Sequence, residues 1–390
     1  ARTLLKRVRA LSEEDRRSLA DVSMNRCALV RVVVNDKDQG FKVFRVLNTR
    51  GKEPGAHDII KTELFQRSKF TTEEAAFYSE RWAEHEAALG GSAFDDLLRQ
   101  IRSIYDKSSK GELITGFLKN VIPKITARGF LDDVLPRYVD AYKVITTARL
   151  EHGTHANLIS DKLNQMRALD QTSWRAPALK FLVEHGVDHE SAPEFFAKLE
   201  RLSYIIMLVL TDRDQRTKRF NKVNETISSN RTLFGRGSPF NITKDESRRA
   251  FDRMLGRFAT FGQRRSMALR LNAALDGGFT IPPQSDATVE HVLPRNISED
   301  SHWMIIWPDP AKRREQCDTL GNFVLLTNKV NQKADRMDYR AKKDVYFNGG
   351  GGQDFALTRD LVDQEAWTSE VVRKRTERLA EILMMEWKLL

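Results

Sequence analysis

The stretch Thr288-Val289-Glu290-His291-Val292-Leu293-Pro294 decides how the last quarter of this chain is expected to fold. Its β-branched residues predict a short strand, and Pro294 closes that strand because proline cannot continue a hydrogen-bonded ladder. The strand carries an acid and a histidine side by side, Glu290 and His291. Neighbouring residues of a strand point to opposite faces, so these two side chains serve one site only if the strand end bends or bulges.

Two stretches further along the chain extend this pattern. Residues 320–326, with the sequence Leu-Gly-Asn-Phe-Val-Leu-Leu, predict a second strand, and residues 328–346 predict a helix that begins near Asn331. The order is then strand, long connection, strand, helix. This order resembles the ββα-metal fold of HNH (His-Me finger) nucleases.

The rest of the chain has mostly helical patterning. Apolar residues recur at spacings of three and four, as in Phe94, Leu97, Leu98, Ile101 and Ile104. We therefore expect a mainly α protein with a small α+β part, in which a helical middle domain precedes the nuclease domain. The expected boundaries are 1–70, 71–280 and 281–390. Within the first of these, residues 1–20 predict helix, with a helix start at Ser12. Residues 27–34 predict a strand, residues 41–47 a helix and residues 56–65 another helix.

Composition restricts the classes of partner. The 390 residues carry 64 Lys and Arg against 54 Asp and Glu, a formal net charge of +10 that favours a polyanion such as nucleic acid. No apolar run is long enough to span a bilayer and no signal peptide is recognisable, so no membrane partner is expected. The two cysteines lie far apart, which predicts a cytoplasmic protein with reduced thiols. The start at Ala1, without methionine, predicts a fragment or a processed product.

Phosphodiester hydrolysis would explain the polar residues of these strands. The reaction needs a cation beside the scissile phosphate and a base for the attacking water. Glu290 and Asn331 offer the oxygen ligands that Mg²⁺ or Mn²⁺ prefers. The pKa of a histidine lies near neutrality, so His291 suits the base. Asn322 is expected to fix the loop that holds His291 or to orient its ring.

The same segments resemble the C-terminal domain of the GmrSD family of restriction endonucleases. The resemblance covers residues 290–294, 320–326 and 328–333, and it continues through Lys342-Lys343 with Tyr346, Trp367, residues 375–380 and Trp387. It implies an anti-phage, modification-dependent DNA endonuclease with His291 as general base, Glu290 and Asn331 around the metal, and Asn322 as a supporting position. In this sequence the third residue of the HNH motif is therefore Asn331 rather than a histidine.

Residues 41–51 and 58–61 resemble the end of that family's ParB-like N-terminal domain. Complete members carry an Asp-Gly-Gln-Gln-Arg motif tied to nucleotide hydrolysis, and this sequence lacks that motif. The resemblance implies a ligand-facing or interdomain role for Asn48 and Arg50. Both residues fit equally well a plain helix end, in which Gly51 supplies a positive φ angle.

Double-stranded DNA, including modified phage DNA, is the expected partner, and Lys342, Lys343 and Arg295 are the expected phosphate contacts. A nucleotide bound by the full-length protein and a homo-oligomer remain open. The alternative function is a DNA-binding or sensor module whose nuclease is silent without the N-terminal part. A third interpretation, action on RNA, also stays open because HNH chemistry does not by itself exclude RNA.

Overall fold

The computed structural model describes residues 2–27, 55–106, 111–150, 152–229, 233–277, 286–348, 352 and 354–390. The chain divides into two compact units, Ala1–Pro54 and Gly55–Leu390. Nearly all of the strand expected at 27–34, and the whole helix expected at 41–47, lie outside the described residues. Asn48 and Arg50 lie outside them as well, so their expected roles stay predictions.

The first unit contains helices α1 (Arg2–Arg9) and α2 (Glu13–Asp21), followed by a π-helical turn at Val22–Arg26. The backbone N–H of Asp15 donates to the Ser12 hydroxyl at 3.1 Å. This bond satisfies one of the free N–H groups at the helix start, as an N-cap residue does. The predicted start at Ser12 is therefore confirmed.

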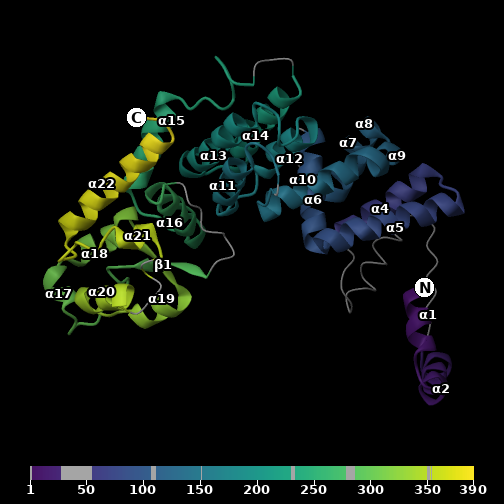
Figure 1. Ribbon diagram of the computed structural model, residues 1–390, viewed down its shortest axis with the longest axis horizontal. Helices are drawn as coiled ribbons and strands as arrows, with labels where there is room; N and C mark the ends of the chain where they lie inside the picture. Colours follow the sequence, from purple (N-terminus) through teal and green to yellow (C-terminus); the bar gives the residue numbers. More distant parts are fainter. Residues whose placement is uncertain are drawn as a thin grey trace. The chain divides into compact units, whose positions relative to one another are not determined.

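The second unit is helical up to residue 275, as its apolar spacing predicts (Figure 1). Its helices before the sheet are α4 (Ala56–Ser68), α5 (Thr72–Leu89), α6 (Gly91–Tyr105), α7 (Leu113–Asn120), α8 (Ile122–Ile125), α9 (Ala127–Gly129), η3 (Phe130–Val134), α10 (Leu135–Thr147), α11 (Ala156–Arg167), α12 (Arg175–Glu184), α13 (Ala192–Val209), α14 (Arg213–Ile227), α15 (Lys244–Leu255) and α16 (Phe261–Leu275). The remaining helices are α17 (Trp303–Ile306), α18 (Pro310–Gln316), η4 (Leu320–Asn322), α19 (Asn328–Ala334), α20 (Tyr339–Asn348), α21 (Ala356–Arg359) and α22 (Ser369–Glu386).

Within the described residues, one two-stranded antiparallel sheet joins β1 (Ala287–His291) to β2 (Phe323–Thr327). Glu290 lies opposite Val324, and His291 lies opposite Phe323. Helix α19 begins directly after β2, so the predicted order of strand, strand and helix is present. The single helix predicted for residues 328–346 is wrong in one respect: it is split into α19 and α20. Asp335 has a φ angle of +27°, which a right-handed helix cannot contain.

The two faces of this sheet belong to different hydrophobic clusters. Ala287, Phe323 and Leu325 pack in a large cluster that extends from Ile60 to Trp387. Val324 and Leu326 pack in a second cluster with Trp303, Trp307 and Trp367. The large cluster therefore includes residues from both sides of position 280, and residues 55–390 form one compact unit. The boundaries expected at 70 and 280 stay predictions.

A buried arginine of α22 holds the start of β2. The Arg375 guanidinium donates to the backbone carbonyls of Gly321, Phe323 and Leu357 at 2.7–2.9 Å. It also donates to the Asp360 carboxylate at 2.8 Å, and Arg375 is only 5% exposed. Gly321 allows this close approach, because a Cβ atom at that position would lie 2.1 Å from a backbone oxygen of α22. Arg375 therefore sets where η4 and β2 lie.

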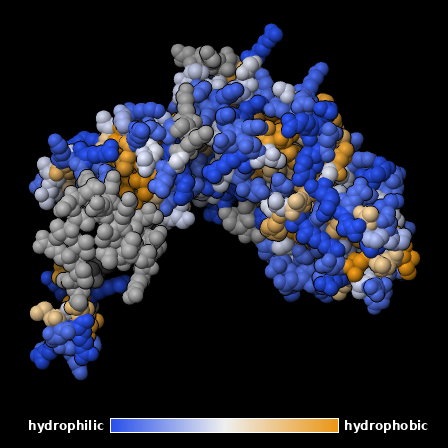
Figure 2. Space-filling model, turned by 180° about the vertical axis from the view of Figure 1, so that it is seen from behind, coloured by the Kyte–Doolittle hydropathy of each residue, from blue (hydrophilic) through white to orange (hydrophobic). Residues whose placement is uncertain are grey.

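The described helices include none that is both long and apolar enough to cross a membrane. The face drawn in Figure 2 is largely hydrophilic, with small separate hydrophobic patches.

Replacing Arg375 with methionine should lower the free energy of unfolding by about 3–5 kcal/mol, because it leaves three buried carbonyl oxygens without this donor and removes one of the two arginines that pair with Asp360. Urea unfolding followed by circular dichroism measures this loss. The control is Arg373→Met on the same helix, since Arg373 is half exposed and pairs with Glu370 and Glu377, whose side chains reach solvent. It should change stability by less than about 0.5 kcal/mol. Equal stability of the two variants would contradict the role of Arg375.

Candidate active site

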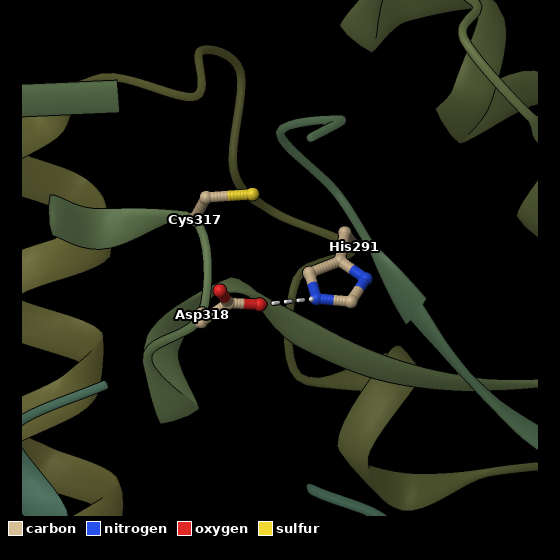
Figure 3. Close-up of side chains that lie close together, drawn as sticks. All are labelled: His291, Cys317 and Asp318. Carbon is tan, nitrogen blue, oxygen red and sulfur yellow. Dashed lines mark hydrogen bonds and ion pairs between the residues drawn. The ribbon is translucent and has the colours of Figure 1, made fainter. Parts of the chain in front are cut away.

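His291 ends β1 and faces a carboxylate from the segment that leads into η4. Its Nε2 atom lies 3.1 Å from Oδ1 of Asp318, the contact drawn as a dashed line in Figure 3. The ring meets Phe323 edge-on, at 5.2 Å between centroids and 87° between planes. The His291 side chain is 16% exposed, so its ring is held in place yet still reaches solvent.

The surroundings of His291 favour the neutral imidazole. Burial lowers the pKa of His291, and the hydrogen bond with Asp318 opposes that shift only in part. The carboxylate can only accept, so Nε2 carries the proton and Nδ1 keeps its lone pair. No hydrogen bond to Nδ1 is present among the described residues. A neutral, oriented imidazole with one free lone pair can accept a proton from water.

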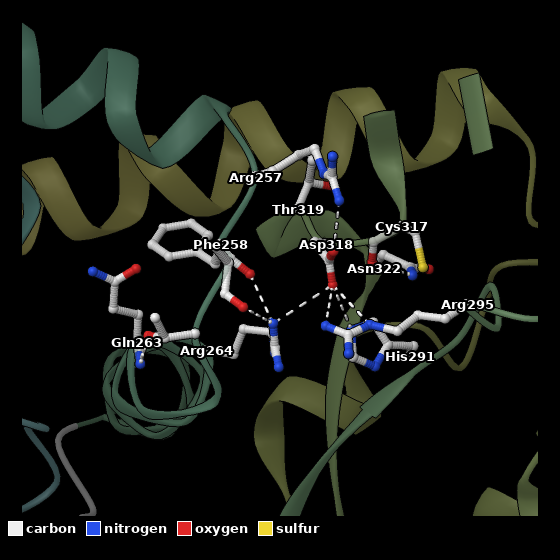
Figure 4. Close-up of polar contacts among 12 residues, drawn as sticks. Arg257, Phe258, Gln263, Arg264, His291, Arg295, Cys317, Asp318, Thr319 and Asn322 are labelled. Carbon is white, nitrogen blue, oxygen red and sulfur yellow. Dashed lines mark hydrogen bonds and ion pairs between the residues drawn. The ribbon is translucent and has the colours of Figure 1, made fainter. Parts of the chain in front are cut away.

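Three arginines surround Asp318, as Figure 4 shows. Arg257 approaches Oδ2 at 3.0 Å, Arg295 donates to Oδ1 at 3.0 Å through its Nε, and Arg264 lies 3.8 Å from Oδ1. Burial alone would raise the pKa of Asp318, but hydrogen bonds from His291, Arg295 and Arg257 outweigh it. They hold the pKa of Asp318 well below its usual range. Asp318 is therefore a carboxylate at neutral pH.

Asn322 is fully buried and fixes the loop after β1. Its Oδ1 accepts the Leu293 N–H at 2.7 Å and the Trp367 indole N–H at 2.9 Å. Its Nδ2 donates to the carbonyls of Leu293 at 3.0 Å and Cys317 at 2.8 Å. One amide thus ties together the loop that follows His291 and the residue before Asp318. In this arrangement Asn322 positions the site and does not itself face solvent.

The structure places Glu290 away from His291, which differs from the expectation of one shared site. Because β1 runs straight through to His291, Glu290 points to the opposite face of the sheet. There it is buried, forms an ion pair with Lys342 and receives a hydrogen bond from the Tyr346 hydroxyl at 3.4 Å. Burial raises the pKa of Glu290 and lowers that of Lys342, and their mutual attraction opposes both shifts.

One of the three expected DNA contacts is corrected by this arrangement. Lys342 is fully buried and donates to Glu290 and to the His291 carbonyl, so a DNA phosphate cannot reach it. Lys343 donates to the carbonyls of Val362 at 2.7 Å and Gln364 at 2.9 Å, which engage two of the three N–H groups of its ammonium, so its contact with DNA stays a prediction. Arg295 differs from both, because its side chain is 45% exposed and lies beside His291.

In this structure the expected metal ligands, Glu290 and Asn331, each have partners within the protein. Glu290 faces an ammonium group that already neutralises it. The Asn331 amide N–H donates to the Thr288 hydroxyl at 2.8 Å, on the face of β1 that carries Glu290. Another group near the site, His291 with Cys317 and Asp318, has ligand atoms within 4.8 Å of one another. Burial raises the pKa of Cys317 to about 12, so its thiol stays protonated, and three arginines already engage Asp318.

Sequence reasoning did not find Asp318 or Arg257. Asp318 stands among residues of ordinary loop composition, and Arg257 lies in the segment between α15 and α16, thirty positions before the start of β1. The basic pair Arg264-Arg265 is visible in the sequence, but nothing there connects it to His291. A contact between the backbone N–H of Phe258 and the carbonyl of Asp318 at 2.8 Å brings these distant segments together.

Residues 242–382 match the family described as GmrSD restriction endonucleases, C-terminal domain. This match agrees with the family predicted from the sequence and supports a nuclease domain of a restriction system. The matched region begins before residue 281 and includes Arg257 and Arg264. No curated protein matches the chain.

Asn322→Ala should unfold the loop after β1, because it removes the Asn322 hydrogen bonds of four buried backbone and indole groups, of which, among the described residues, only the Leu293 carbonyl keeps another donor, the weak Cys317 thiol. At about 1–3 kcal/mol for each unsatisfied group, we expect a loss of at least about 3 kcal/mol in the free energy of unfolding. Thermal unfolding measures it, with Asn296→Ala as control because Asn296 is exposed on the same loop. A loss no larger than that of the control would show that Asn322 does not hold the loop.

Proposed function

We propose that this chain is a DNA endonuclease or nickase of an anti-phage, modification-dependent restriction system, with an HNH-type mechanism. In this mechanism His291 is the general base. The observation that carries the proposal is the half-enclosed His291 ring, hydrogen-bonded through Nε2 to Asp318 beside three arginines. The match of residues 242–382 to a restriction endonuclease domain supports the same reaction class.

The residues of the site suit hydrolysis of a phosphodiester. Asp318 holds the proton on Nε2 of His291, so that Nδ1 accepts the proton of the attacking water. The arginines supply positive charge where negative charge grows on the phosphate oxygens. Asn322 keeps the backbone on both sides of this pair in place.

A second candidate, a DNA-binding or sensor module with a silent nuclease, is favoured by one observation. Glu290, the expected metal ligand, is buried and neutralised by Lys342. A site that lacks a free carboxylate for a cation would bind DNA without cutting it. Binding of plain and modified DNA without cleavage under any cation condition would favour this candidate over the nuclease.

His291→Ala should reduce the rate of DNA cleavage by about 10²–10⁴-fold, the usual contribution of a general base. Supercoiled plasmid and modified phage DNA are incubated with each protein and resolved on agarose gels, which separates nicking from double-strand cleavage. The matched control is His302→Ala, since His302 lies in the same region outside the site. Cleavage by a clean His291→Ala preparation at the unmutated rate would rule out the proposed mechanism.

The sequence predicts Mg²⁺ or Mn²⁺ as cofactor, so EDTA should stop cleavage and either ion should restore it. Because Glu290 forms an ion pair with Lys342, we expect it not to bind the metal ion. Glu290→Gln should lower protein stability yet leave unchanged the Mg²⁺ concentration that gives half-maximal cleavage. A Mg²⁺ titration of the cleavage rate measures this concentration. A rise of tenfold or more would show instead that Glu290 binds the ion.

A further inference from the structure

The arginines beside His291 carry more positive charge than their surroundings neutralise. Among the described residues, Arg257, Arg264 and Arg295 form ion pairs with one carboxylate, Asp318, which leaves an excess of two positive charges while His291 is neutral. The pKa of Arg264 is lowered by its burial and next by the charge of Arg295, as repulsion between like charges requires. Such an excess at a partly enclosed site favours an anion.

The three arginines differ in how they are held. Arg264 is buried, and its guanidinium donates to the backbone carbonyls of Phe258 at 2.9 Å and Ala259 at 2.8 Å. It therefore fixes the segment that carries Arg257. The side chains of Arg257 and Arg295 are 56% and 45% exposed, and they approach Asp318 from different segments. Figure 4 shows Asp318 among these groups, with His291 next to Arg295.

We propose that Arg257 and Arg295 bind the scissile phosphodiester of double-stranded DNA beside His291, and that the Asp318 carboxylate occupies their guanidinium donors in the free protein. Guanidinium groups bind phosphate and carboxylate oxygens with the same forked geometry, so one can replace the other. The inference rests on the proposed nuclease function and names its phosphate-binding groups. It also makes residues 257–264, outside the segment 281–390, part of the site.

This exchange gives Asp318 two opposing effects. It orients His291, which favours cleavage, and it competes with DNA for Arg257 and Arg295, which weakens binding. Asp318→Asn keeps the size of the side chain and removes its charge. The variant should therefore bind DNA more tightly and cut it more slowly. A purely structural role for Asp318 would weaken both together.

The test measures binding of a fluorescein-labelled DNA duplex by anisotropy at several salt concentrations, with all variants made in the His291→Ala background of the full chain. Arg257→Met should weaken binding about 3–10-fold at low salt and reduce the slope of log K against log salt by about 1, the effect of one lost phosphate contact. Arg248→Met is the control, because Arg248 is an exposed arginine of α15 that pairs with Asp245. Asp318→Asn should tighten binding several-fold.

Cleavage by Asp318→Asn and Arg257→Met, each in the unmutated background, completes the test, and both should cut more slowly. An Arg257→Met affinity and salt slope equal to those of Arg248→Met would overturn the phosphate site, as would weaker binding by Asp318→Asn. If the unmutated protein never cuts DNA but the binding pattern holds, the nuclease proposal fails and the phosphate site stands. If cleavage needs His291 but Arg257→Met leaves DNA binding unchanged, the phosphate site fails and the nuclease proposal stands.

Discussion

Alternation of side chains along β1 is the constraint on which the site depends. Neighbouring residues of a strand face opposite sides, and β1 remains regular through its last residue. Glu290 therefore enters the core formed with α20, whereas His291 faces the segment before η4. A bulge at this point would bring the two side chains to one face. The regular strand instead separates a buried ion pair from a partly exposed imidazole.

Buried polar groups then set the position of each part of the site. Asn322 joins the loop after β1 to Cys317, and Arg375 joins η4 and β2 to α22. Both side chains bind backbone groups that would otherwise be buried without partners. Loss of either therefore costs more than one hydrogen bond, because several groups lose their partner together. The geometry of His291 and Asp318 follows from these two anchors.

Charge at the site comes from segments that lie far apart in the chain. Asp318 forms ion pairs with Arg257, from the segment between α15 and α16, and with Arg295, from the loop after β1. The Phe258 N–H donates to the carbonyl of Asp318, and Arg264 holds the same turn. The family match that begins at residue 242 includes this segment, which agrees with a site built partly from the helical region.

The sequence by itself determined the two strands, the helix after them, the helical region up to residue 275, the start at Ser12 and the restriction endonuclease domain. These features follow from local periodicity, helix capping and the order of motifs, and each of these signals lies in residues that are close together in the sequence. Only the tertiary structure decided that Lys342 neutralises Glu290, that Lys343 binds backbone carbonyls, and that Asp318 and Arg257 stand beside His291. Ion pairs between distant segments depend on how those segments pack, and spacing along the chain does not encode which charges meet.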